Sequence, residues 1–220
     1  MATKETKERI LDAAEQLLVE HGFGGTSIRG IASAAGVNLA SINYHFGSKE
    51  ALIQAVFERR VGPVNEERLR LLGQLEQSAS DGPLPVAGIT EAFVHPALGL
   101  RRLDDSQRRV LQCLLGHTIS LPSGKARDAF LEQFSEVVQR FTIALGRALP
   151  DLTPQEVLWR FFFMVGTLVQ TLAMAEDMPR ISRGLCGETD AEAMERWLVP
   201  FIAAGLKAPA AEVRLEADDA

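Results

Sequence analysis

A chain of 220 residues, of which 46% are hydrophobic and 24% charged, can bury a core as one large domain or two small ones, which excludes a disordered or fibrous chain. The first residues are charged throughout and no run reaches about 18 apolar residues, so we expect a cytoplasmic protein with no membrane partner. The net charge of -6 is weak evidence against a nucleic-acid partner, because phosphate neutralisation normally shows as a basic excess.

Strand signals are scarce along the chain, so the predicted fold is all-α. The first helix is expected over about residues 4–21, where apolar residues recur at spacings of three and four, and Gly22 is placed to end it. The second should begin at Thr26, whose hydroxyl can cap free N–H groups, and should end at Gly36.

Two more helices follow closely. The third is capped by Asn38 and runs to Phe46, and the fourth runs from Ser48 to Gly62-Pro63. The expected inner side of the third consists of Ala40, Ile42 and Phe46. Four helices in so short a stretch predict a compact N-terminal domain over residues 1–60.

The rest of the chain also predicts helices, separated by segments rich in glycine and proline. They are expected at residues 65–77, 86–99, 104–118, 125–148, 154–176 and 190–206. The helix after Thr153 is apolar nearly all round, so it has to be buried on more than one side. We expect residues 61–207 to form a helical C-terminal domain, followed by a frayed acidic tail at residues 208–220.

The second and third helices, joined by a tight turn at a glycine, predict a helix-turn-helix whose reading helix spans about residues 38–46. In such a motif the second helix lies in the major groove, and Asn43 has the amide that can pair bidentately with adenine. Base contacts are expected from Leu39, Ala40, Ser41 and Asn43. Phosphate contacts are expected from Tyr44, His45 and Lys49.

The charge of this segment neither supports nor excludes the motif. Residues 1–60 carry seven basic and seven acidic residues, so the whole surplus of -6 belongs to residues 61–220. The seven basic residues are Lys4, Lys7, Arg9, Arg29, Lys49, Arg59 and Arg60.

Residues 26–57, TSIRGIASAAGVNLASINYHFGSKEALIQAVF, closely resemble the DNA-binding segment of TetR-family transcriptional regulators. The likeness includes the Ala35-Gly36-Val37 and Tyr44-His45-Phe46 runs in the order and spacing of the family. The sequence of this segment is most similar to that of a PsrA-like, fatty-acid-sensing subgroup.

Carried over by position, the resemblance implies base and phosphate contacts at Thr26, Ser27, Arg29, Leu39, Ala40, Ser41, Asn43, Tyr44, His45 and Lys49. Many members have a tyrosine where this chain has Asn43, so its operator should differ from theirs. The resemblance also implies an all-α homodimer that binds double-stranded DNA at a palindromic operator, most often as a repressor, until a small molecule binds the C-terminal domain and releases it.

The last two long helices have more apolar surface than one small domain can cover, which predicts a four-helix bundle between two subunits. The residues expected in this homodimer interface are Leu158, Phe161, Val165, Leu168, Leu172, Trp197, Leu198, Phe201 and Ile202.

Aromatic residues of the C-terminal domain are candidates for an effector pocket, although a purely structural core explains them too. They are Phe130, Phe134, Phe141, Trp159, Phe162 and Phe163. An apolar lining with Arg140, Arg147 or Arg160 near it would suit an acyl chain with an anionic head group. A fatty acid or an acyl thioester is therefore the candidate effector class.

No cofactor, metal site or catalytic group is expected. Cys113 and His117 lie four apart on an expected helix, but no second pair completes a zinc site. Hydrolase, P-loop and dinucleotide-binding motifs are absent, so we expect no enzyme activity. The alternative is a helical small-molecule-binding protein or enzyme that does not act on DNA, for which the neutral charge of residues 1–60 is the only support.

Overall fold

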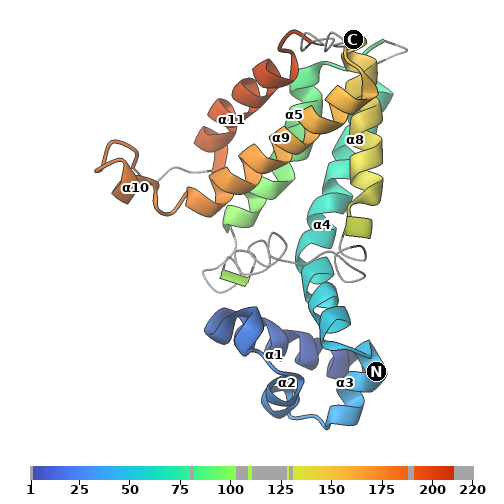
Figure 1. Cartoon of the computed structure of the whole chain (residues 1–220), viewed down its shortest axis with the longest axis vertical. Coiled ribbons are helices and arrows are strands. Elements are labelled where there is room, and N and C mark those ends of the chain that lie inside the picture. Colours follow the sequence, from blue (N-terminus) through green and yellow to red (C-terminus); the bar gives the residue numbers. More distant parts are fainter. Residues whose placement is uncertain are drawn as a thin grey trace, which may run out of the picture. The chain divides into compact units, whose positions relative to one another are not determined.

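A computed structural model describes residues 2–79, 82–102, 109–110, 128, 131–187 and 191–210. These residues form helices and no strand, which confirms the predicted all-α fold (Figure 1). The elements are α1 (Ala2–Gly25), α2 (Ile28–Ala35), α3 (Leu39–Phe46), α4 (Lys49–Ser78), α5 (Val86–Leu98), the 3-10 helix η1 (Gly99–Arg102), α8 (Ser135–Ala148), α9 (Pro154–Met174), α10 (Met178–Ile181) and α11 (Ala191–Leu206).

Internal contacts divide the chain into two compact units. The first unit is made of Met1–Arg70 and His95–Val137, and the second of Leu71–Val94 and Val138–Ala220. The domain bounds predicted from the sequence stay a prediction, and residues 211–220 of the expected tail lie outside the described residues.

The core of the first unit is a cluster of buried apolar side chains from α1, α2, α3 and the first half of α4. Ile10 of α1, Ile31 of α2, Ile42 of α3 and Val56 of α4 are all fully buried in it. Because α3 buries only one face in this cluster, the cluster determines which residues of α3 face outward.

The ends of α1 and α2 show one prediction confirmed and one wrong. Gly22 breaks α1 with a φ of 65°, as expected. The N-cap of α2 is Ser27, whose hydroxyl accepts from Gly30 N at 3.1 Å, and not Thr26. Thr26 is buried, and its hydroxyl donates to the carbonyls of Leu17 and Gly22 at 3.0 and 2.7 Å. It therefore joins the start of α2 to the end of α1.

Helix α4 does not end at Gly62-Pro63 as predicted, but continues to Ser78. Proline removes one backbone donor from a helix, yet the ring of Pro63 lies on the exposed side. The buried side continues through Val61, Val64 and Leu72, and this packing keeps the chain helical past the proline.

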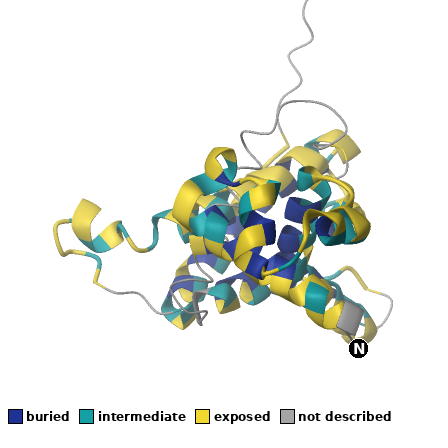
Figure 2. Ribbon diagram, turned by 90° about the horizontal axis from the view of Figure 1, so that it is seen from below, coloured by how far each residue is buried: buried dark blue, intermediate teal, exposed yellow. Residues whose placement is uncertain are grey.

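Two further differences concern the C-terminal half. The helix expected over residues 125–148 is interrupted by a turn at residues 133–134, where Phe134 N donates to the Leu131 carbonyl, and α8 begins at Ser135. The short helix α10 was not predicted. Its segment is exposed almost throughout, including Leu185, and lies at the left of Figure 2. Most of the helix expected at residues 104–118 lies outside the described residues.

The second unit is centred on three phenylalanines from α5, α8 and α9. Phe93 meets Phe141 and Phe161 edge to face, with ring centroids 5.2 and 5.3 Å apart. All three side chains are buried. Edge-to-face pairs of this kind add to the stabilisation that burial provides, so the cluster holds these three helices together.

Candidate nucleic-acid interface

Helices α2 and α3 form the predicted helix-turn-helix. α2 ends at Gly36, which has a left-handed φ of 63° and donates through its N–H to the carbonyl of Ala32. α3 begins after Asn38, whose side chain accepts from Ser41 N at 2.8 Å. Only three residues separate the two helices, so the glycine, which adopts a positive φ without strain, sets the tightness of the turn.

The face of α3 that turns away from the core carries the side chains expected to contact DNA. Tyr44 is 81% exposed and Asn43 and Leu39 are exposed as well, while Ile42 between them is fully buried. Ala40 is also exposed, so its assignment to the inner side of the helix was wrong. Its assignment as a base contact stays a prediction. The outward face of α3 is thus polar and aromatic, and the buried face anchors it.

Ser41 and His45 lie at the edges of this face and are half-buried. The Ser41 hydroxyl donates to Asn38 Oδ1 at 2.9 Å, so its oxygen retains acceptor capacity for a base. The His45 ring stands edge-on to Tyr44, with centroids 5.2 Å apart. At the start of the motif, Ser27 and Arg29 are exposed.

Two basic side chains hold this motif through main-chain carbonyls. Arg9 of α1 donates to the carbonyls of Ala35 and Gly36 at 2.5 and 3.1 Å, at the turn itself. Lys49 donates to the Phe23 carbonyl at 2.8 Å, and its ammonium lies 4.5 Å from the centroid of the Phe23 ring. Arg9 was missed by the sequence analysis, because nothing in the sequence indicates which carbonyl a distant arginine will reach.

Ion pairs join α1 to α4 within the same unit. Arg59 binds Asp12 at 2.6 Å and lies 3.7 Å from Glu8, and Arg60 Nε donates to Glu15 at 2.8 Å. Burial works to lower the pKa of Arg59, but the hydrogen bond that Arg59 donates to Asp12 and the nearby carboxylates of Glu15 and Glu8 outweigh it and raise that pKa. These pairs neutralise two of the seven basic residues of the segment.

The outward face of α9 differs from the predicted interface. Leu158 of α9 and Trp197 and Phe201 of α11 are exposed, as an intersubunit contact requires. Val165 and Leu172 are half-buried. Four of the predicted residues face the core of their own chain instead and were wrongly assigned: Phe161, Leu168, Leu198 and Ile202.

The aromatic residues predicted for an effector pocket have different surroundings. Phe141 is packed in the core of the second unit, and Phe134 packs against Phe57 in the first unit, with ring centroids 5.7 Å apart. The other three described residues of the set, Trp159, Phe162 and Phe163, are exposed on α9. Phe130 lies outside the described residues. The exposed aromatics therefore extend the outward face of α9, whereas Phe134 and Phe141 pack against other side chains of their own units.

The three arginines considered for an anionic head group have different surroundings. Arg160 is 8% exposed and donates to the carbonyls of Leu206, Ala208 and Pro209 and to Glu156, all at 2.6 or 2.7 Å. These four bonds use both terminal nitrogens of the guanidinium, so Arg160 closes the C-terminal end of α11. Arg140 is bound to Glu76 at 2.6 Å.

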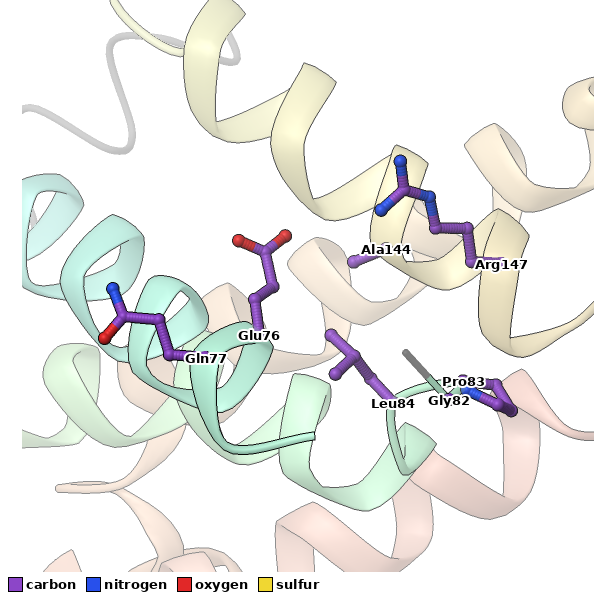
Figure 3. Close-up of a pocket in the computed structure, with 7 residues that line it drawn as sticks. All are labelled: Glu76, Gln77, Gly82, Pro83, Leu84, Ala144 and Arg147. Atoms are coloured by element: carbon purple, nitrogen blue, oxygen red, sulfur yellow. The ribbon is translucent and has the colours of Figure 1, made fainter. Parts of the chain in front are cut away.

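Arg147 lines a surface cleft of about 700 Å³ in the second unit. Figure 3 shows Glu76 on one wall, Ala144 and Arg147 on α8 as the other, and Leu84 between them. The mixture of charged and apolar groups could receive a small amphipathic molecule. A smaller cleft of about 350 Å³ lies between α9 and α11, where Phe163 and Phe201 flank it.

By length and composition alone, α9 could cross a membrane, since an 18-residue window of it reaches a mean hydropathy of 1.5. A core helix of a globular protein passes the same test, so one such helix is weak evidence. The expectation of no membrane partner stays a prediction. The described residues contain no group of three metal-ligating side chains, and Cys113 and His117 lie outside them.

Two family models match the chain. Residues 10–56 match the model described as "Bacterial regulatory proteins, tetR family", which covers α2, α3 and the start of α4. Residues 91–205 match "Tetracyclin repressor-like, C-terminal domain", which covers more than half of the chain.

Curated relatives match over part of their length. AcrR of Shigella flexneri, an HTH-type transcriptional regulator, is 27% identical over 142 residues, which is 62% of this chain and 62% of AcrR. The transcriptional repressor BepR of Brucella suis is 34% identical over 106 residues, 48% of this chain and 47% of BepR. The chain thus spans less than two thirds of these relatives.

Solved structures are similar over almost the whole chain, at identities that show the fold alone. NalD of Pseudomonas aeruginosa superposes with a TM-score of 0.61 at 22% identity, covering 93% of this chain and 97% of NalD. FadR of Bacillus subtilis, solved in complex with stearoyl-CoA, gives a TM-score of 0.61 at 17% identity, covering 90% and 98%. With the helix-turn-helix and both family models in agreement, the chain belongs to the TetR family of transcriptional regulators.

Proposed function

We propose that the protein is a DNA-binding transcriptional repressor in which α3 reads the major groove. The observation that carries this proposal is the outward face of α3, with Asn43 and Tyr44 exposed beside the buried Ile42. A solvent-facing helix needs no aromatic ring there, whereas an amide and a phenol suit base edges and phosphates. The proposed contacts are the main chain at Thr26 and the side chains of Ser27, Arg29, Leu39, Ala40, Ser41, Asn43, Tyr44 and His45.

We propose that two chains pair through the outward face of α9 and α11. Support comes from the large apolar side chains that this face leaves in water: Leu158, Trp159, Phe162, Phe163, Trp197 and Phe201. A contiguous apolar surface of this kind marks an interaction site in soluble proteins. Two-fold pairing would present two reading helices about 34 to 36 Å apart, or a multiple of it, and so requires a palindromic operator.

The proposed repressor is released by a small-molecule effector that binds the C-terminal helices. A fatty acid or an acyl-CoA is the class to test first, and the PsrA-like likeness of the sequence points the same way. A similar fold, that of FadR, was solved with stearoyl-CoA. Of the three candidate arginines, we propose Arg147 for an anionic head group, because it lines the cleft, whereas Arg140 is bound to Glu76 and Arg160 to main-chain carbonyls and Glu156.

A gel-shift titration tests the proposal. The purified protein is titrated against the duplex upstream of its own gene, with and without fatty acids and acyl-CoAs. The expected result is a palindrome-specific complex that one member of the panel dissolves. If the protein bound the duplex specifically and no member of the panel affected the complex, the proposed regulator would stand and the proposed acyl effector would be rejected. The absence of DNA binding on any duplex at low salt would contradict the repressor and favour a small-molecule-binding protein.

A further inference from the structure

The basic residues near the reading helix are not equally available to phosphates. Four of the seven in residues 1–60 are already engaged: Arg59 and Arg60 with carboxylates of α1, and Arg9 and Lys49 with main-chain carbonyls. The other three have no acidic or carbonyl partner among the residues that the structure describes. These are Lys4, Lys7 and Arg29.

One of these three, Lys7, lies beside the end of α3. The ammonium group of Lys7 is 5.9 Å from the centroid of the Phe46 ring, and Phe46 is the last residue of α3. Figure 1 shows the N-terminal end of α1 next to α3. Lys4 precedes Lys7 by three residues, so both lie on one face of the same helix, and both are exposed. Lys7 therefore lies beside the reading helix, and Lys4 continues the same exposed face of α1 one turn earlier.

We infer that Lys4 and Lys7 bind phosphates of the DNA backbone beside the groove that α3 enters, and that Lys49 is a positioning residue. The inference rests on the proposed DNA reading by α3. Phosphates line both edges of a major groove about 12 Å wide, so a long flexible side chain next to an inserted helix can reach them. In this inference Lys4 and Lys7, at the start of α1, replace Lys49 as the residues that contact phosphates.

Lys49 has a different task because its ammonium is already bound. It donates to the Phe23 carbonyl at 2.8 Å and lies over the Phe23 ring. A move to a phosphate would give up both the hydrogen bond and the cation–π contact. Since Phe23 follows the break at Gly22 and Lys49 opens α4, this bond ties the end of α1 to the helix that follows the reading helix.

The salt dependence of DNA binding separates a phosphate contact from a positioning bond. The logarithm of the association constant falls with the logarithm of the salt concentration by about 0.9 for each phosphate neutralised. Removing a phosphate contact reduces this slope, whereas removing a positioning bond lowers the affinity without changing the slope.

The experiment uses the full chain and fluorescence anisotropy from about 50 to 200 mM salt, the range over which phosphate contacts change affinity strongly. The variants are Lys4→Gln, Lys7→Gln, Lys49→Gln and Lys49→Arg. Lys207→Gln, at the exposed residue just after α11, is the control for loss of one positive charge. We expect Lys4→Gln and Lys7→Gln each to reduce the slope by about 0.9 per bound protomer, and Lys207→Gln to leave it unchanged. Lys49→Gln should weaken binding at an unchanged slope, and Lys49→Arg, which can still donate to the Phe23 carbonyl, should restore it.

Two results would overturn the inference while the proposed function stands. One is a wild-type slope in both α1 variants, and the other is a reduced slope in Lys49→Gln alone. Phosphate contacts do not depend on sequence, so an unrelated duplex gives the same readout if the operator differs from the duplex chosen. If the unmodified protein bound neither duplex at low salt, the proposed function itself would fail, and this inference with it.

Discussion

Helices α3 and α9 both carry aromatic side chains in water, but they differ in how well the sequence predicts which side faces outward. In α3 the apolar residues that have to be buried are few, and Ile42 alone determines the phase of the helix against the core. α9 is apolar nearly all round, so any of several faces could be turned inward. The comparison shows that periodicity predicts the orientation of a helix only where one side is clearly polar.

The largest expected effect tests the outward face of α9 and α11. Phe201→Asp should abolish pairing and raise the Kd of the dimer by at least about 100-fold, because a carboxylate buried against apolar side chains costs about 3 to 5 kcal/mol. Light scattering would then give the mass of one chain. Ile143→Asp is the control, since Ile143 is an exposed apolar residue on α8 outside this face. A Phe201→Asp protein that keeps the mass of a dimer would show that the outward face has another use.

On the inward face of α9, a substitution at Arg160 should lower the stability of the fold. Arg160→Ala removes hydrogen bonds to three carbonyls at the end of α11 and to Glu156, and should lower the free energy of unfolding by about 3 kcal/mol. Denaturation with urea measures it. Arg180→Ala, which removes an arginine from an exposed pair with Asp177, should leave the unfolding midpoint unchanged. Equal effects of the two substitutions would mean that Arg160 does not hold α11.

Adjacent residues of α3 should behave in opposite ways. Asn43→Ala should reduce operator affinity about tenfold or more, since a bidentate base contact is worth about 1 to 3 kcal/mol, and should leave the free energy of unfolding unchanged because Asn43 is exposed. Ile42→Val should do the reverse, with about 1 kcal/mol lost from stability. Fluorescence anisotropy measures the operator affinity of both variants, and thermal unfolding measures their stability. If Asn43→Ala bound the operator with full affinity, Asn43 would not be a base contact.

The smallest expected effects compare Thr26 with Ser27 at the start of α2. Thr26→Val removes the buried hydroxyl whose one hydrogen serves the carbonyls of Leu17 and Gly22, and should cost about 2 kcal/mol of stability. Ser27→Ala removes the N-cap and should cost about 1 kcal/mol. Denaturation curves give both values. The reverse order would show that the Ser27 cap contributes more to stability than the buried Thr26 hydroxyl does.

Local chemistry explains why much of the first unit could be predicted. Gly22 and Gly36 adopt positive φ values, and Asn38 caps the next helix through its own side chain. Each of these properties depends on one residue and its immediate neighbours. The helix-turn-helix and the exposure of Asn43 and Tyr44 follow from them.

Long-range contacts explain what the sequence could not show. The bond from Arg9 to the turn at Ala35 spans 26 residues, and the bonds from Arg160 to the end of α11 span 46 or more. No pattern along the chain indicates such pairings. The continuation of α4 through Pro63 is of the same kind, because burial of Val64 beyond the proline outweighs the local tendency to end the helix.

A footprint of the protein on the duplex upstream of its own gene tests the central claim most directly. The account predicts two protected half-sites related by a palindrome, about 34 to 36 Å apart or a multiple of that distance, and their loss in the Asn43→Ala, Tyr44→Ala double variant. A single asymmetric half-site would contradict pairing through α9 and α11. A footprint that survives in the double variant would contradict the assignment of α3 as the reading helix.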